Sequence, residues 1–158
     1  MKIDLSILTS EEFEYLLNTT LFHDDVLRRK LKWLSHEENL IEENYYDKET
    51  EKRQLNYCEQ LLKEITNCNN LFKKIRISKG INPFEITKEE YNELLKFLVE
   101  QIYHAQNRKK DFGGDRFHWG DKNCSILIKQ ELGYIHSLEK VFNKYKGKYT
   151  YQSILDTL

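Results

Sequence analysis

Apolar residues recur at intervals of three, four and seven positions along most of this 158-residue chain. Such spacing places their side chains on one face of an α-helix, so it predicts amphipathic helices that pack against one another. The chain has a single proline, Pro83, and it uses many Glu, Lys and Leu residues, which favour helices. We predict an all-α fold, a bundle of five or six helices, in one domain over residues 1–158.

Capping residues predict where the helices begin and end. Thr9 and Thr87 each precede a glutamate by three positions, which is the form of a capping box. Gly80, followed by Asn82 and Pro83, marks the clearest helix end. We expect helices over residues 10–20, from Asp24 or Asp25 to Ile41, from Asp47 to Gly80, from Thr87 to a central loop, and from Asp121 or Asn123 to Gly147, with a short turn after Thr150.

Two of these helices carry predicted buried faces that bear on function. The second has two adjacent apolar stripes, which implies neighbours on two sides and leaves a homodimer open. The third has one stripe. The residues are Val26, Trp33, Leu40, Leu27, Leu34, Ile41 and Leu31 for the second helix, and Leu55, Cys58, Leu62, Ile65, Phe72 and Ile75 for the third.

Near the N-terminus, Ile3, Leu5 and Ile7 alternate with polar residues, a pattern that predicts at most a short strand. Residues 9–17 and 87–95 share a similar pattern of polar and apolar positions. This similarity indicates either two pseudo-repeated helical hairpins or two helix starts that use the same capping residues.

Composition and charge narrow the function classes. The formal net charge is −1, so no overall field draws the protein to nucleic acid or to an anionic membrane. No apolar run approaches the roughly 20 residues that span a bilayer, and no signal peptide is apparent, which predicts a cytoplasmic protein without a membrane partner. The three cysteines lack C-x-x-C spacing, which argues against a disulfide framework and against a zinc ribbon.

The stretch 111–123 interrupts the helical pattern and is predicted to be a loop. It holds Gly113, Gly114 and Gly120, which permit tight backbone turns. A guanidinium, an imidazole and flat aromatic rings together suit recognition of a partner. The alternative is that the aromatic rings pack onto the bundle and close its end. The candidate binding residues are Arg108, Lys109, Lys110, Phe112, Asp115, Arg116, Phe117, His118 and Trp119.

No phosphate-binding glycine loop, dinucleotide motif or serine nucleophile motif occurs in the sequence. We therefore expect a binding protein that recognises and neutralises a protein partner, of the inhibitor or immunity kind, through the 108–121 loop. The alternative ligand is a nucleotide or cyclic nucleotide, with Trp119 stacked on the base and Arg116 on a phosphate. No cofactor is expected.

A third hypothesis is enzymatic. Arg29 and His36 are seven positions apart, which resembles the arginine and histidine motif of the all-helical HEPN ribonucleases. The resemblance implies RNA cleavage through these two residues. No metal is expected, because no paired Glu-x-x-His motif occurs, and Glu100 and His104 are predicted to face solvent as a pair.

Overall fold

A computed structural model describes residues 1–43, 48–114 and 120–158; for residues 35–43 and 50 it describes the backbone only. Within these residues the chain forms five helices and one two-stranded sheet, which confirms the all-α fold with a short N-terminal strand. In chain order the elements are β1 (Lys2–Ile3), α1 (Ser10–Glu43), α2 (Lys48–Ser78), β2 (Phe84–Glu85), α3 (Lys88–Gly114), α5 (Asp121–Tyr145) and α6 (Tyr151–Leu155).

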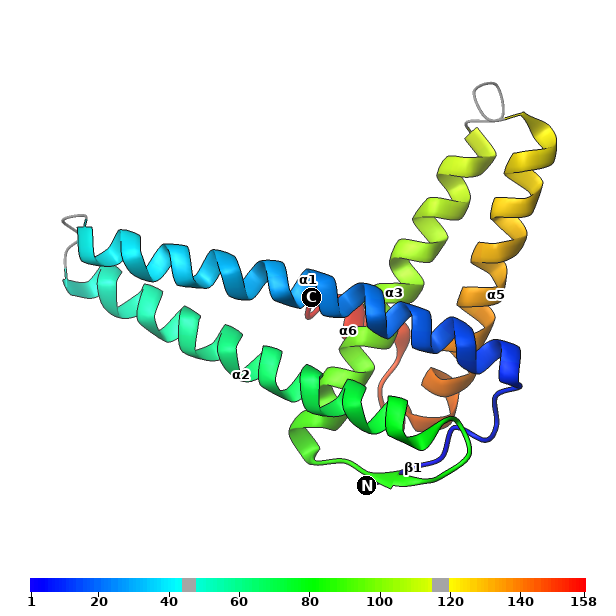
Figure 1. The fold of residues 1–158 in the computed structure, drawn as a ribbon, viewed down its shortest axis with the longest axis horizontal. Coiled ribbons are helices and arrows are strands. Elements are labelled where there is room, and N and C mark those ends of the chain that lie inside the picture. Colours follow the sequence, from blue (N-terminus) through cyan, green and yellow to red (C-terminus); the bar gives the residue numbers. More distant parts are fainter. Residues whose placement is uncertain (44–47, 115–119) are drawn as a thin grey trace.

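The helices form two hairpins that share a base and then diverge (Figure 1). Helices α1 and α2 make a long hairpin, whose outer part, residues 27–43 and 48–65, we call the arm. Helices α3 and α5 make the second hairpin, and α1 crosses them near the base. Within the described residues, the two helices of the arm are neighbours of each other beyond the point where the arm leaves the base (Figure 1).

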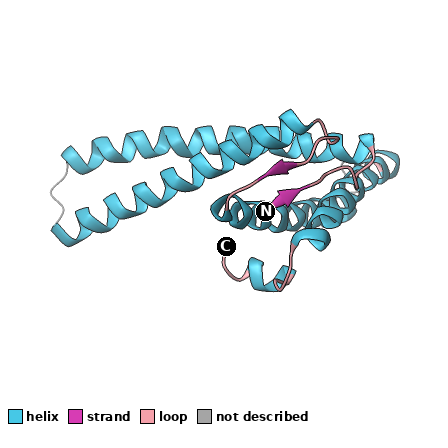
Figure 2. Cartoon of the chain, turned by 90° about the horizontal axis from the view of Figure 1, so that it is seen from below, coloured by secondary structure: helices cyan, strands magenta, loops and turns pink. Residues whose placement is uncertain are grey.

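The small sheet closes the base. Strands β1 and β2 pair antiparallel, with Ile3 opposite Phe84, and lie side by side at the base (Figure 2). The hydroxyl of Tyr145, at the end of α5, accepts from the Asp4 amide at 2.6 Å and donates to the Asp4 carbonyl at 3.0 Å. These bonds fix the N-terminal strand to the second hairpin.

The core lies where the hairpins cross. Helix α3 is its centre: α2, α5 and α6 pack around it, and α1 reaches it through the ring contact of His23 with Phe97. At helical spacing along α3, Leu94, Leu95, Leu98, Ile102 and Ala105 are buried and Tyr91 is half-buried. Phe97, Val99 and Gln101 are also buried, since neighbours cover more than one face of α3.

The prediction of two helices within residues 10–43 is wrong, because α1 runs through this stretch without a break. The Thr19 and Thr20 hydroxyls donate to backbone carbonyls one turn earlier, so these polar residues fit inside the helix. Asp24 forms an ion pair with Arg76 of α2 instead of capping a helix. An ion-pair partner on another helix, which the sequence pattern does not show, has replaced the expected cap.

The predicted loop 111–123 is too long. Residues 111–114 continue α3 and residues 121–123 belong to α5, so Gly113 and Gly114 are helical. The N-cap of α5 is Gly120, with a φ of 79° and no side-chain capping bond; Asp121 and Asn123 are therefore not its caps. A glycine costs a helix only about 1 kcal/mol, which is too little to end one whose earlier turns are well packed.

The predicted buried face of α2 is partly wrong. Leu55 and Leu62 are exposed, whereas Leu61, Cys68 and Leu71 are buried beside the correctly predicted Cys58, Ile65, Phe72 and Ile75. On α1, Trp33 and Leu31 are exposed as well, although both were predicted to be buried. Periodicity shows which side chains share a face, but it does not show whether a neighbour covers that face.

Most predicted helix limits are confirmed. Thr9 and Glu12 form a reciprocal capping box, with bonds of 3.0 and 3.2 Å. The Thr87 hydroxyl accepts from the Glu90 amide at 3.1 Å, but the Glu90 carboxylate binds the Lys74 ammonium at 2.9 Å. Helix α2 ends at Ser78, and Gly80 follows with a left-handed φ of 72°.

Gly80→Ala should destabilise the fold by about 1 to 2 kcal/mol or more, because a Cβ is strained at this φ and would lie 2.8 Å from Phe13 Cγ. Gly113→Ala is the matched control: it is helical, and nothing lies within 4 Å of its added Cβ. We expect this variant to be up to about 1 kcal/mol more stable than wild type. Chemical denaturation measures both changes, and equal effects of the two substitutions would contradict this account.

Candidate functional site

Arg108, the first of the predicted binding residues, already has a partner. Its Nε and Nη2 donate to the two carboxylate oxygens of Glu131 on α5, at 3.0 and 3.1 Å. Only 10% of the Glu131 side chain is exposed. This bidentate pair fastens α3 to α5, so the Arg108 guanidinium is engaged within the protein.

The remaining predicted residues are placed as follows. Lys109 and Lys110 are exposed on α3, and Phe112 is half-buried there. Asp115, Arg116, Phe117, His118 and Trp119 lie outside the described residues, so both loop hypotheses, protein binding and nucleotide binding, stay predictions. Arg29 is exposed on α1, and the side chain of His36 is outside the description, so RNA cleavage also stays a prediction.

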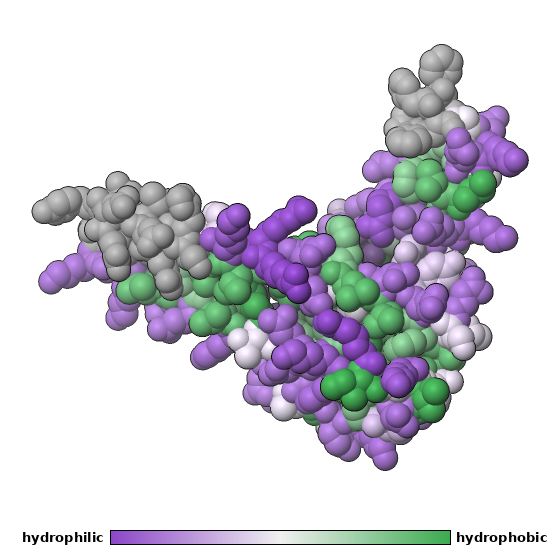
Figure 3. All heavy atoms as spheres, viewed as in Figure 1, coloured by the Kyte–Doolittle hydropathy of each residue, from purple (hydrophilic) through white to green (hydrophobic). Residues whose placement is uncertain are grey.

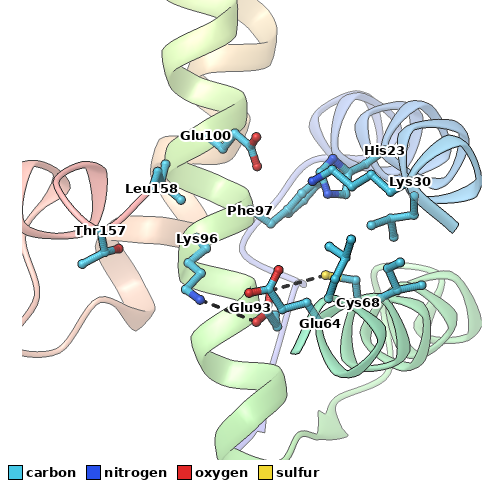
Figure 4. Close-up of a pocket in the computed structure, with 13 residues that line it drawn as sticks. His23, Lys30, Glu64, Cys68, Glu93, Lys96, Phe97, Glu100, Thr157 and Leu158 are labelled. Atoms are coloured by element: carbon cyan, nitrogen blue, oxygen red, sulfur yellow. Dashed lines mark hydrogen bonds and ion pairs between the residues drawn. The ribbon is translucent and has the colours of Figure 1, made fainter. Parts of the chain in front are cut away.

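A polar cavity of about 270 Å³ lies between α1, α2, α3 and the C-terminal residues. Figure 4 shows the residues that line it, which come from all of these segments. Its charged lining is Lys30, Glu64, Glu93, Lys96 and Glu100, and its other polar lining includes His23 and Cys68. Lysines and glutamates are both present, so the cavity suits a ligand group that carries its own charge or hydrogen-bonding atoms.

His23 is a buried titratable group of this cavity, with 6% of the residue exposed. Its ring packs edge-on against Phe72 and Phe97, and Nδ1 lies 3.4 Å from the Gln101 amide nitrogen. Burial lowers its pKa, an effect that the Glu100 carboxylate opposes and the Lys30 ammonium reinforces. The imidazole is therefore neutral near pH 7.

Cys68 and Glu93 form the floor of the cavity. The thiol donates to Glu93 Oε2 at 3.5 Å, and burial together with this carboxylate raises the pKa of the Cys68 thiol far above its usual value. Burial also raises the pKa of Glu93, against the effect of Lys96 at 3.8 Å. A thiol held in its protonated form is a poor nucleophile, so this pair does not resemble an activated cysteine site.

Beyond the cavity, the same side of the arm carries an aromatic pair. The rings of Trp33 and Tyr57 meet edge-on with centroids 6.3 Å apart, and the residues are 46% and 54% exposed. Trp33 follows Lys30 by one helical turn, and Tyr57 precedes Glu64 by two turns, so all four share one side of the arm. We call Lys30, Trp33, Tyr57 and Glu64 the aromatic flank.

The two charged members of the aromatic flank are available to a partner. Lys30 projects from α1 and Glu64 from α2 (Figure 4). Neither forms an ion pair with any other residue in the described ranges. The flank therefore offers one ammonium and one carboxylate beside two exposed rings.

The described part of the chain contains no group of three or more His, Cys, Asp or Glu side chains placed to hold a metal ion. Glu100 and His104 form the predicted exposed pair, at 3.8 Å. Across the described helices, none combines the length and the apolar character that crossing a bilayer requires.

No family model matches the chain, and the searches of curated proteins and of solved structures found no match.

The aromatic flank was not predicted as a site, because the spacing of Trp33 places it among residues expected to be buried. The same stretch of sequence nevertheless indicates that Trp33 is partly exposed. Lys30 and Trp33 are one turn apart on a helix whose charged residues from position 28 to 32 are all basic. An aromatic residue next to such a charged turn is typical of a partly exposed helix face.

Arg108→Ala should lower the free energy of unfolding by about 2 kcal/mol, because it leaves the mostly buried Glu131 carboxylate without its charged donor. Lys109→Ala is the matched control, since Lys109 is exposed on the neighbouring position of α3. We expect that control to stay within about 0.5 kcal/mol of wild type. Urea titration of the three proteins measures this, and an unaltered Arg108→Ala midpoint would show that the pair adds nothing.

Acidification should destabilise the fold through His23. Its folded pKa lies below the usual 6.5, so the unfolded chain takes up the proton first and stability falls as the pH drops below about 6.5. His23→Gln should flatten the change in melting temperature between pH 7.5 and 5.5, whereas His136→Gln, at an exposed histidine, should not. Thermal melts across this range measure the slopes; identical slopes for all three proteins would exclude His23 as the cause.

Proposed function

We propose that the protein acts by binding another protein in a stoichiometric complex and that the aromatic flank forms the recognition surface. The observation that carries this proposal is the exposed, edge-on pair of Trp33 and Tyr57 on an arm that projects from the base. Trp and Tyr are among the residues that most often dominate binding energy at protein interfaces. Because the rings already hold each other in place, little side-chain entropy is lost when a partner covers them.

The charges beside the rings define the partner's chemistry. A carboxylate of the partner would meet the Lys30 ammonium, and a cationic group would meet Glu64, so the complementary surface carries both signs. The polar cavity between them, at about 270 Å³, has room for one long side chain of the partner. Recognition would thus combine an apolar anchor with two charge pairs.

Action as an inhibitor or immunity protein is consistent with this surface, because such a protein works by covering its target. The groups closest to the surface, a neutral His23 and a protonated Cys68, supply no activated nucleophile. The predicted loop residues from Asp115 to Trp119 remain a second candidate surface. The two sets of residues do not overlap in the sequence and can be tested separately.

Trp33→Ala with Tyr57→Ala should abolish capture of a specific partner from an extract of the source cells. Tyr103→Ala, at a tyrosine of α3 that is 43% exposed, is the matched control and should capture the same partner as wild type. Quantitative mass spectrometry of the captured proteins gives the comparison. Each ring is about half covered, so the double change should lower the free energy of unfolding by about 2 to 3 kcal/mol, and circular dichroism must show that the variant is folded.

The outcome that would remove the proposal is a captured set that is identical for wild type, the double variant and the control. Once a partner is captured, Lys30→Glu and Glu64→Lys should each weaken its binding at least tenfold by calorimetry. The effect should shrink at high salt, because exposed charge pairs are screened.

A further inference from the structure

The opposite side of the arm carries a line of exposed leucines. Leu31, Leu55 and Leu62 are 41%, 46% and 48% exposed. Leu31 lines a shallow hollow with Asn69, and Leu62 and Leu55 precede Asn69 by seven and fourteen positions, so all three leucines lie on one side. We call Leu31, Leu55 and Leu62 the leucine flank; a band of apolar side chains is visible on one face of the arm in Figure 3.

The arm cannot bury this flank by itself. A pair of helices has one seam, and here that seam is filled by Leu27, Leu34, Cys58, Leu61 and Ile65. Helix α3 and the C-terminal residues lie on the polar-cavity side, so they leave the leucine flank facing outward. Two further helices are the usual means of covering such a hairpin, which gives a four-helix bundle.

The arm is built to match a second copy of itself in an antiparallel arrangement. By helical spacing, Arg28 and Lys32 share the α1 face of Leu31, and positions 38 and 42, both glutamates, follow on that same face. A twofold axis near residue 35 would therefore place the basic half of each α1 beside the acidic half of the other. This charge pattern is self-complementary only when the two helices are antiparallel.

The leucines point to the same axis independently. A twofold axis midway between Leu55 and Leu62 exchanges them, so that each leucine of one chain meets the other leucine of its partner. The ring contact between Trp33 and Tyr57 shows that the middle of α1 and this part of α2 lie at one level of the arm. The position of the twofold axis inferred from the α1 charges and the position inferred from the leucines thus agree to within about one helical turn.

We propose that two copies of this chain pair through their leucine flanks as an antiparallel four-helix bundle. The arm is about 25 Å long and two helices wide, so the pairing would bury about 1,000 Å² in total, at the lower end of specific interfaces. The dimer is therefore expected to dissociate on dilution. The aromatic flank lies on the other side of the seam and remains accessible in it.

Light scattering after size exclusion, across a dilution series, tests the dimer. Wild type should change from dimer to monomer on dilution, with dissociation favoured by added salt. Leu62→Glu should remain monomeric at the highest concentration, and Ile77→Glu, at an equally apolar α2 residue near the base that is 75% exposed, should behave as wild type. Circular dichroism confirms that each variant is folded, which separates lost pairing from lost structure.

A cysteine experiment tests the register. Leu55→Cys and Leu62→Cys chains, mixed and oxidised, should give a disulfide between the two variants, whereas each variant alone should give little. A monomer at every concentration, a dimer insensitive to Leu62→Glu, or a disulfide formed equally well by one variant alone would each overturn the proposal. None of these outcomes depends on whether the aromatic flank binds another protein, so the two proposals fail or succeed separately.

Discussion

The contact on which the structure depends is the cluster of His23, Phe72 and Phe97. These three rings come from α1, α2 and α3, and their centroids lie between 4.9 and 5.6 Å apart. The cluster is the point at which the first hairpin is fastened to the second. Aromatic groups of this size dominate packing energy, and edge-on geometry adds a modest directional preference. A neutral imidazole is required there, because a charged one would be buried against two phenyl rings.

This junction explains why the two proposed binding surfaces lie on the arm. Packing on α3 uses the part of α1 around His23 and the part of α2 around Phe72, so the turns beyond them extend into solvent as the arm. In the base, each side chain packs against residues from several helices or strands, and most side chains there are buried. On the arm only the seam is constrained, and the two flanks are free to carry exposed rings, leucines and charges.

The sequence predicts local structure better than it predicts neighbours. The capping box at Thr9 and the left-handed Gly80 depend on bonds within a few residues, and both are confirmed. Asp24, by contrast, has the right chemistry for a cap but is taken by Arg76, which lies 52 positions away. Trp33 and Leu62 have the right spacing for a core but extend past the last element that could cover them. For Asp24 a tertiary contact replaces the structure that the local pattern predicts. For Trp33 and Leu62 the tertiary contact that the pattern predicts is missing.

The same reasoning applies to the candidate site. The cavity residues His23 and Cys68 are single residues of α1 and α2, and no spacing in the sequence shows that they meet Glu93 of α3. The seam between the flanks is one layer of side chains thick, and Leu27 and Ile65 line the hollows on both sides of it. A substitution at Leu27 or Ile65 would therefore alter both flanks. The two surfaces of the arm are thus physically linked through the seam, although they face in opposite directions.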